Sequence, residues 1–226
     1  MTELVKRFAR VLAPAVMAGT LLAAPLAPSA VAAPCPDVQV VFARGTMEPP
    51  GVGNVGQAFV DSLQSRVDAK SVDVYPVTYP ASTDFPTAAQ GVADASNHVR
   101  QMAATCPSTK LVLGGYSQGA AVIGYVTAAA IPAGYTLPAD IAGPMPPDVA
   151  KHVAAIALFG QPSSRFLTAI DAPPIALGPL YAPKTIDQCV VDDPICTNDG
   201  GNLGAHGQYV ANGMVDQAAI FAAQRL

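Results

Sequence analysis

The segment Lys110-Leu111-Val112-Leu113-Gly114-Gly115-Tyr116-Ser117-Gln118-Gly119 decides the fold of this chain. Its apolar first half predicts a short strand, and the apolar, alanine-rich residues 120–130 that follow predict a helix. A serine in the pattern G-x-S-x-G between a strand and a helix is typical of a sharp elbow that presents a nucleophile. Side chains two residues before and after that serine would collide with the neighbouring strand and helix, which accounts for Gly115 and Gly119.

Further apolar runs extend this unit into a sheet. Five strands are expected, at residues 38–43, 72–78, 111–114, 153–159 and 183–186. Helical apolar patterns lie between most of them and after the last, at residues 56–67, 92–103, 120–130 and 210–221. Strands that alternate with helices form a parallel sheet covered on both faces, so the expected fold is α/β, a three-layer α/β/α sandwich around a central five-stranded parallel sheet.

The N-terminus has the pattern of a secretory signal peptide. Basic residues precede the uncharged stretch 11–33, which ends in Ala30-Val31-Ala32-Ala33, so cleavage is expected after Ala32 or Ala33. A retained membrane anchor is the alternative, because the stretch is nearly long enough to span a bilayer. Its prolines and its small-residue end favour cleavage. We therefore expect residues 1–33 to be removed and residues 34–226 to form a single domain that is secreted or associated with the cell wall.

The charge of the exported part limits its partners. The whole chain has 12 basic and 16 acidic residues, and removal of the first 33 residues takes away three of the basic ones and one acidic one. The remaining net charge of about −6 argues against nucleic acid and against an anionic membrane as the main partner. We expect a monomer with at most transient contact with a lipid interface.

All four cysteines lie in the exported part, where an even number predicts two disulfides. The short spacing of Cys189 and Cys196 favours a local disulfide between them, which leaves Cys35 to pair with Cys106. A zinc site is the competing interpretation, but the spacings do not match one, and no histidine lies close to the first pair.

Position relative to the strands selects a general base. Ligands of an open parallel sheet bind beyond the carboxyl ends of the strands, so the loops that follow strands form the functional edge, and Ser117 lies there. Of the three histidines, His98 falls within a predicted helix and is interpreted as a solvated surface residue. His152 directly precedes a strand, at the opposite edge. His206 follows the last strand, so elimination makes it the expected base for a serine nucleophile.

The base needs a carboxylate to hold its tautomer, and the chain order serine, acid, histidine places that carboxylate between positions 117 and 206. Four aspartates after the last predicted strand qualify: Asp187, Asp192, Asp193 and Asp199. Asp192 and Asp193 lie within the loop that the local disulfide would close, which would fix the position of either one. The pattern alone does not choose between these two.

An oxyanion hole needs donors directed at the developing negative charge. The backbone N–H of Gln118, the residue after the nucleophile, is one expected donor. Thr46 follows the first predicted strand and offers both a hydroxyl and an N–H, although a simple turn residue is the alternative interpretation.

Taken together, these motifs resemble the cutinase family, and most closely its mycobacterial cutinase-like branch. The resemblance runs from about Cys35 to the C-terminus, and its residues are Phe42-Ala43-Arg44-Gly45-Thr46, Gly115-Tyr116-Ser117-Gln118-Gly119, Asp193-Pro194-Ile195-Cys196 and Ala205-His206. It implies an α/β-hydrolase fold with little or no lid, and a serine esterase that needs no metal and no cofactor.

The resemblance also implies roles for individual residues. It makes Ser117 the nucleophile and His206 the base. It makes Asp193 the acid, three residues before the second cysteine of the local disulfide, and so decides between the two aspartates. Its oxyanion donors are Gln118 and Thr46, where fungal members have serine. Its disulfides are the pairs that the spacing favours, Cys35–Cys106 and Cys189–Cys196.

The chain departs from the compact fungal pattern in two segments. Residues 131–148 form a Pro- and Gly-rich insertion that leads into a strand, so we expect it at the edge opposite the site and not as a lid. Residues 161–181 follow a strand and are expected to place apolar side chains beside the site, with residues 79–85 as the opposite wall. The apolar positions in the second segment are Phe166, Leu167, Ile170, Ile175, Leu177 and Leu180.

Two other functions compete with a secreted esterase that acts on short- to medium-chain acyl esters. Residues 51–56 read G-x-G-x-x-G before a helix, but seven residues separate them from the preceding strand, so a turn and a helix start are favoured over a dinucleotide site. A catalytically inert surface protein that retains the fold is the second alternative. The sequence does not identify the natural ester, be it cutin, triacylglycerol, phospholipid or thioester.

Overall fold

Five parallel strands form one sheet in a computed structural model that describes residues 34–68, 70–133 and 143–226. The strand order is β2-β1-β3-β4-β5, with every neighbouring pair parallel. The strands are β1 (Val38–Ala43), β2 (Val72–Pro76), β3 (Lys110–Tyr116), β4 (Val153–Phe159) and β5 (Thr185–Gln188). The predicted leader and part of the predicted insertion, residues 134–142, lie outside the described residues.

The burial of each strand explains its sequence. All six residues of β1 are buried, as are nearly all of β3 and β4, because these central strands are covered on both faces. The edge strands β2 and β5 are short and only partly buried. The predicted last strand lies two residues too early, because residues Ala182–Lys184 form a 3₁₀ turn in which a proline occupies one of the first positions.

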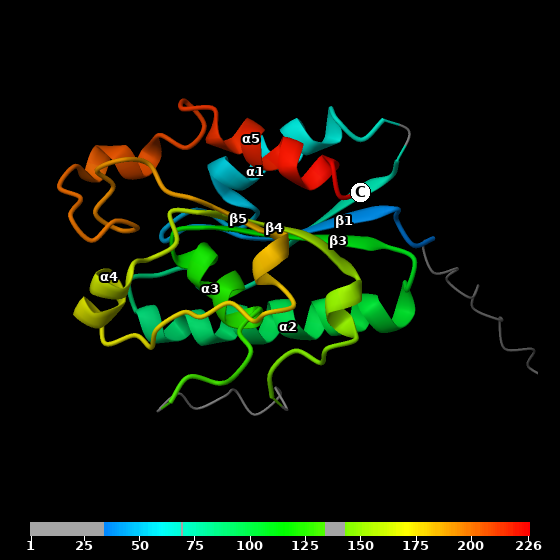
Figure 1. Ribbon diagram of the computed structural model, residues 1–226, viewed down its shortest axis with the longest axis horizontal. Helices are drawn as coiled ribbons and strands as arrows, with labels where there is room; N and C mark the ends of the chain where they lie inside the picture. The colour runs from blue at the N-terminus through cyan, green and yellow to red at the C-terminus, as the bar shows by residue number, and fades with distance from the viewer. Residues whose placement is uncertain (1–33, 69, 134–142) are drawn as a thin grey trace, which may run out of the picture. The chain divides into compact units, whose positions relative to one another are not determined.

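Helices cover both faces of the sheet (Figure 1). They are α1 (Gly53–Gln64), α2 (Ala88–Thr105), α3 (Gln118–Val126), α4 (Ser164–Ala169) and α5 (Met214–Ala223), with 3₁₀ turns at Phe85–Thr87, Val149–Lys151, Ala182–Lys184 and Leu203–Gly207. The first and last helices pack on one face, against a core that contains Phe42, Phe59 and Phe159. Helices α2 and α3 pack on the other face, against Val41, Leu113 and Ile156. The expected three-layer α/β/α sandwich is therefore the fold of the described residues.

Two helices are shorter than their apolar patterns. The helix α3 ends at Val126, and Ala128 forms an antiparallel bridge with Leu177 instead of continuing the helix. The last helix begins at Met214, so that Val210 lies in the preceding turn and is about half exposed. Among the described residues, no helix combines the length and the hydrophobicity needed to cross a bilayer.

The interpretation of His98 as a solvated residue is wrong. Its ring stacks on Tyr75 with 3.4 Å between centroids, and its Nε2 lies 2.7 Å from Gln39 Oε1. Burial lowers the pKa of His98. Gln39 of β1 and Tyr75 of β2 contact His98 on the side of α2. The apolar pattern of α2 alone does not reveal these contacts. The residue still lies on a helix and not at the carboxyl ends of the strands.

Those carboxyl ends carry the segments from which a site is built. The loops after β1, β3, β4 and β5 and the helix α4 gather at one end of the sheet, on the left in Figure 1. The disulfide Cys189–Cys196 closes the loop after β5, and Cys35–Cys106 joins the start of the domain to the end of α2. All four cysteines are thereby oxidised, which leaves no thiolate for the alternative zinc site.

Candidate active site

The serine of the G-x-S-x-G segment lies on a strained turn between β3 and α3. Ser117 has φ 55° and ψ −119°, a conformation that a non-glycine residue adopts at a cost of about 1–3 kcal/mol. Its N–H is held by the carbonyl of Phe159, at 2.8 Å. A Cβ on Gly119 would lie 1.9 Å from the carbonyl oxygen of Ala43, and one on Gly115 would lie 2.2 Å from the carbonyl oxygen of Gly119. Only glycine fits at these two positions, because backbone atoms of a strand and of a helix occupy the space.

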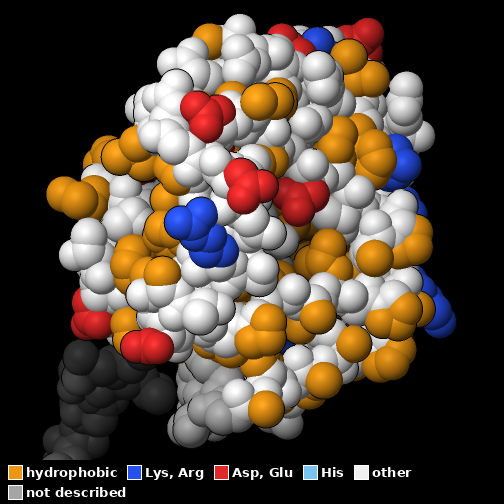
Figure 2. Space-filling model, turned by 60° about the vertical axis from the view of Figure 1, so that its left-hand side comes forward, with side chains coloured by type: hydrophobic (Ala, Val, Ile, Leu, Met, Phe, Trp, Pro, Cys, Tyr) orange, Lys and Arg blue, Asp and Glu red, His pale blue; other side chains and the backbone are white. Residues whose placement is uncertain are grey.

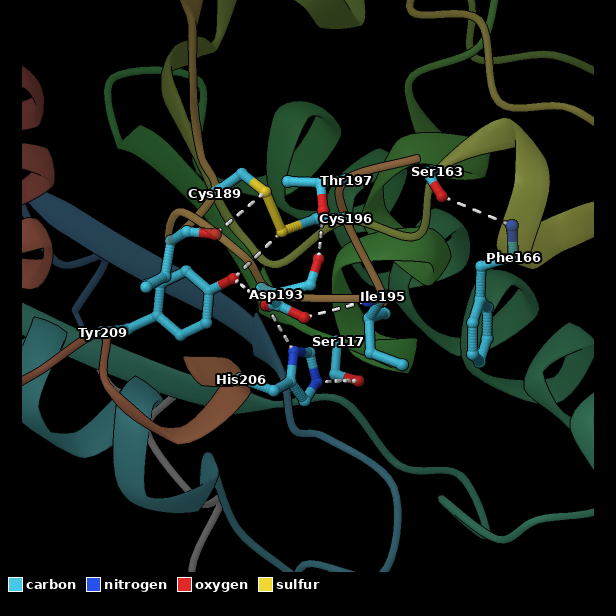
Figure 3. The surroundings of a disulfide bond; sticks show 11 residues. Ser117, Ser163, Phe166, Cys189, Asp193, Ile195, Cys196, Thr197, His206 and Tyr209 are labelled. Carbon is cyan, nitrogen blue, oxygen red and sulfur yellow. Dashed lines mark hydrogen bonds and ion pairs between the residues drawn. A yellow bond between two sulfur atoms is a disulfide. The ribbon is translucent and has the colours of Figure 1, made fainter. Parts of the chain in front are cut away.

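Three of the predicted residues form one chain of hydrogen bonds (Figure 3). His206 Nδ1 lies 2.7 Å from Asp193 Oδ2, and its Nε2 lies 2.8 Å from Ser117 Oγ. Because the carboxylate accepts the proton on Nδ1, Nε2 is left to accept the hydroxyl proton of the serine. The side chain of Asp193 is fully buried, and that of His206 is 14% exposed.

The disulfide loop distinguishes the two adjacent aspartates. Asp193 Oδ1 accepts the N–H of Ile195 at 2.9 Å, and Thr197 binds the main-chain carbonyl of Asp193. Asp192 has a positive φ of 68°, points to solvent and accepts the N–H of Gly201. The other two candidates, Asp187 and Asp199, are exposed. The carboxylate that meets His206 is thus the buried one of the pair.

A tyrosine that the sequence analysis did not single out completes the surroundings of this carboxylate. The hydroxyl of Tyr209 donates to Asp193 Oδ2 at 2.5 Å, and its ring is fully buried beneath the site (Figure 3). Burial and the neighbouring carboxylate raise the pKa of Tyr209, so the phenol stays protonated and remains a donor. Tyr209 follows His206 by three residues, a helical spacing that could have indicated it.

We expect Tyr209→Phe to lower kcat about 10- to 100-fold with little change in KM. A hydrogen bond to a charged group contributes about 1.5–3 kcal/mol, and the variant leaves the buried carboxylate with one donor fewer. Steady-state kinetics on a soluble ester measure the effect. The matched control is Tyr181→Phe, since the buried Tyr181 hydroxyl meets no hydrogen-bond partner among the described residues. Equal losses in both variants would contradict the role of Tyr209.

A second tyrosine holds the histidine from its other side. Tyr116 stacks on the ring of His206 with 5.0 Å between centroids, and its hydroxyl donates to the main-chain carbonyl of His206 at 2.7 Å. Burial, together with the charges of Glu48 and Asp193, raises the pKa of Tyr116 to about 12. The imidazole is therefore fixed by its backbone and by its ring as well as by Asp193.

The predicted oxyanion donors lie beside the serine. Gln118 is the first residue of α3, where backbone N–H groups have no partner within the helix and the helix dipole is positive. Thr46 Oγ1 lies 3.4 Å from Gln118 Oε1, and Gln118 Nε2 donates to the carbonyl of Ser82 at 3.1 Å. The structure thus brings together the two residues on which the sequence analysis places the hole.

Arg44, which the sequence analysis gave no role, holds the loop of Thr46 in place. Its guanidinium is buried and donates to main-chain carbonyls, that of Tyr79 at 2.6 Å and that of Glu48 at 2.9 Å. The N–H of Met47 donates to the carbonyl of Ala81 at 2.6 Å. These contacts tie the loop after β1 to the segment after β2.

An apolar hollow of about 460 Å³ opens over Ser117 and His206. Three of the predicted apolar positions in the 161–181 segment line it, namely Phe166, Leu167 and Ile170. The other three do not: Leu177 packs against the core, Ile175 lies against α3, and Leu180 is about half exposed. On the opposite wall, Thr83 and Phe85 line the hollow, whereas Tyr79 is buried in the core.

The face that carries α4 has both hydrophobic and charged side chains. Figure 2 turns this end toward the viewer, and hydrophobic side chains form several separate patches on it, with few Lys and Arg side chains among them. A larger hollow of about 560 Å³ lies elsewhere, along α2 around Tyr75 and Asp94, and none of the predicted site residues lines it. The hollow at Ser117 brings the predicted nucleophile and the predicted base together with an apolar wall.

Comparisons with known proteins show which family this chain is similar to. The family model described as Cutinase matches residues 34–226. A relative from Mycobacterium tuberculosis named probable carboxylesterase Culp5 is 59% identical over 174 residues, 77% of this chain and 98% of the relative. Phospholipase Culp4 of the same organism is 50% identical over 222 residues, 98% of this chain and 92% of the relative.

A solved structure of a cutinase is similar to this chain in both fold and sequence. A Trichoderma reesei cutinase in complex with a phosphonate inhibitor is similar to this chain with a TM-score of 0.63 and 34% identity, over 84% of this chain and 77% of that one.

Proposed function

The chain belongs to the cutinase family of serine esterases, and on that premise we propose that it hydrolyses short- to medium-chain acyl esters through Ser117, His206 and Asp193. The observation that carries the proposal is the continuous hydrogen-bonded chain from Ser117 Oγ through His206 to the buried Asp193 carboxylate, beneath an apolar hollow. A nucleophile within reach of a base that is itself oriented by a third group is the arrangement of covalent catalysis.

The first half of the proposed reaction forms an acyl-enzyme. Ser117 Oγ attacks the ester carbonyl carbon while His206 Nε2 takes the hydroxyl proton. Asp193 stabilises the resulting imidazolium through Nδ1. His206 then gives the proton to the leaving alkoxide oxygen, the carbon–oxygen bond breaks, and the alcohol departs. The acyl group remains bound to Ser117 as an ester.

The negative charge that develops on the carbonyl oxygen needs fixed donors. We assign this role to the backbone N–H of Gln118 and to Thr46, through its hydroxyl or N–H. Such donors cost no reorganisation when the charge develops, and the loss of one typically costs about a hundred- to a thousandfold in kcat. The position of Gln118 at the N-terminus of α3 adds the favourable end of the helix dipole.

The second half of the proposed reaction releases the acid. A water molecule takes the place of the alcohol, His206 removes its proton, and the hydroxide adds to the acyl carbon. Collapse of the tetrahedral intermediate returns the proton to Ser117 and frees the carboxylic acid. These steps use the chain's own side chains and the same oxyanion donors.

The proposal includes the processing and location of the chain. We propose that residues 1–33 are a signal peptide, that residues 34–226 form one domain, and that the mature protein is a monomer outside the cell or at the cell wall. The two disulfides support an oxidising compartment. The N-terminal sequence of the exported protein, expected to begin at Ala33 or Pro34, tests the processing.

Hydrolysis of a p-nitrophenyl ester series, from acetate to palmitate, tests the activity and its chain-length range. We expect turnover with a maximum of kcat/KM at short to medium chains. Each methylene group that is buried in the apolar hollow of about 460 Å³ adds binding free energy until the hollow is filled. The alternative function is an inert surface protein that retains the fold. Folded protein that neither turns over these esters nor reacts with a phosphonate would favour that alternative.

A further inference from the structure

Ser117, Ala121 and Tyr125 form a stripe along α3. Residues four apart in a helix lie on the same face, and all three residues line the hollow over the serine. With a rise of about 1.5 Å per residue, Tyr125 lies about 12 Å along the helix from Ser117. An extended hydrocarbon chain covers that length with about eight to ten carbons, given carbon–carbon bonds of about 1.5 Å. An acyl chain that is attached to Ser117 and extended along this stripe would therefore reach Tyr125 at about its eighth to tenth carbon.

A second hollow of about 160 Å³ lies behind Tyr125. The two hollows share the side chains that separate them: Phe85, Ala88, Tyr125, Ile170 and Ala172. Beyond this partition the second hollow is lined by Pro86, Ala89 and Val92 on one side and by Asp171 and Pro173 on the other. Its space is comparable to that of a cavity of about 150 Å³ that holds a benzene molecule, so it has room for about six further carbons.

The ring of Tyr125 forms part of this partition. Its hydroxyl donates to the carbonyl of Pro173 at 2.5 Å, which ties α3 to the segment after α4. Phe85 and Phe166 approach edge to face, with 6.3 Å between centroids, and both line the first hollow. An acyl chain that grows along α3 therefore meets the ring of Tyr125 before it reaches the second hollow.

We propose that Tyr125 determines the length of acyl chain that this enzyme accepts, and that the hollow behind it is a distal acyl subsite that is closed while the ring is in place. The inference rests on the proposed function, because it requires an acyl chain on Ser117. The acyl chain is the part of the ester that occupies the stripe, since it stays bound to Ser117, at the N-terminus of α3, after the alcohol leaves. Substrates with chains longer than about ten carbons lose the contribution of their distal carbons.

The experiment compares wild type with Tyr125→Ala and Tyr125→Phe in reaction with p-nitrophenyl butyl-, octyl- and tetradecylphosphonates. The readout is the second-order rate constant of inactivation. In wild type we expect octyl to react faster than butyl, and tetradecyl to gain nothing over octyl. In Tyr125→Ala we expect the tetradecyl-to-butyl ratio to rise at least about tenfold, because each methylene newly buried contributes about fourfold. The butyl rate should stay within about twofold of wild type. Tyr125→Phe keeps the ring and should keep the wild-type ratio within about threefold.

A second substitution tests the subsite itself. Ala89 lines the second hollow and the separate hollow along α2 but not the hollow over Ser117, so Ala89→Phe reduces the distal space without entering the first hollow. Added to Tyr125→Ala, it should abolish the gain for tetradecyl; in the wild-type background it should change none of the rates. Should the alanine variant fail to fold, Tyr125→Leu retains an apolar side chain in the partition and carries the same expectation with a smaller gain.

The outcomes separate this inference from the proposed function. An unchanged tetradecyl-to-butyl ratio in folded Tyr125→Ala, or a gain that survives Ala89→Phe, overturns the inference while butyl inactivation still supports the esterase. A wild-type enzyme that already prefers tetradecyl by tenfold over octyl also overturns it. If wild type reacts with none of the phosphonates, the proposed function itself fails.

Discussion

Ser117→Ala is expected to reduce kcat on a soluble ester by about 10⁶-fold, the magnitude that removal of a catalytic serine has produced in another serine hydrolase. Alanine leaves His206 with no hydroxyl to deprotonate, so no covalent acyl intermediate forms. The oxyanion donors and the apolar hollow remain, and residual hydrolysis of about 10³- to 10⁴-fold above water is expected from them. Ser117 is also the strained residue of the elbow, and alanine adopts the same backbone conformation at similar cost.

The measurement is initial-rate hydrolysis of p-nitrophenyl butyrate by purified wild type and variant, with circular dichroism to establish that both are folded. Ser164→Ala is the matched control, since Ser164 is an exposed residue at the start of α4, at the same end of the sheet. It should retain wild-type turnover. Activity of Ser117→Ala within tenfold of wild type would remove this serine from the mechanism and would leave the hydrogen-bonded chain without its proposed use.

Asp193→Asn is expected to lower kcat by about 10⁴-fold, the second-largest effect among the substitutions considered. An asparagine amide presents an N–H where His206 Nδ1 needs an acceptor, so it favours the tautomer with the proton on Nε2. In that tautomer Nε2 is no longer free to accept the proton of Ser117. The variant keeps nearly the same side-chain volume, so the loss should appear in kcat and only weakly in the midpoint of thermal unfolding.

The adjacent residue supplies the control. Asp192→Asn removes an equal charge from the same disulfide loop, but Asp192 points to solvent and only accepts the N–H of Gly201, which the asparagine oxygen also does. Its kcat should remain within about threefold of wild type. The reverse ranking of the two variants would move the acid by one residue and would contradict the hydrogen bond between Asp193 and His206.

The extent to which the sequence predicts the fold depends on how continuous each apolar run is. Strands β1 and β4 begin and end where predicted, because β4 is an uninterrupted apolar run, β1 is apolar at every position but Gln39, and both strands are covered on both faces of the sheet. The edge strand β5 was displaced by two residues, since a strand buried on one side only has a weaker apolar signal and here follows a 3₁₀ turn. The end of α3 was missed, because the bridge between Ala128 and Leu177 involves residues about fifty positions apart.

The residues of the candidate site also fall into two groups, those that the sequence predicts and those that only the folded structure reveals. Ser117 and His206 are predictable, because the chain order of strands and loops places both at one edge of the sheet, and Gly115 and Gly119 mark the elbow by their lack of side chains. Tyr209 was missed, because a buried tyrosine near the last helix has the pattern of a core residue until its hydroxyl is seen to reach Asp193. The interpretation of His98 is wrong for the converse reason, since His98 lies on α2 and its partner Gln39 lies on β1, far away in the sequence.

By itself, the sequence determines the parallel sheet, the elbow at Ser117, the edge at which a ligand is expected to bind and the even set of cysteines, because these follow from local patterns and from the order of elements along the chain. Only the tertiary structure shows the contact between Asp193 and the histidine, which the local pattern leaves open, the tyrosine that supports this aspartate and the side chains that separate the two hollows. Each of these depends on the direction of a side chain and on partners distant in sequence. The left-handed backbone of Asp192, the burial of Asp193 and the bond from Tyr125 to Pro173 belong to the folded loops after β4 and β5, and no local sequence pattern indicates them.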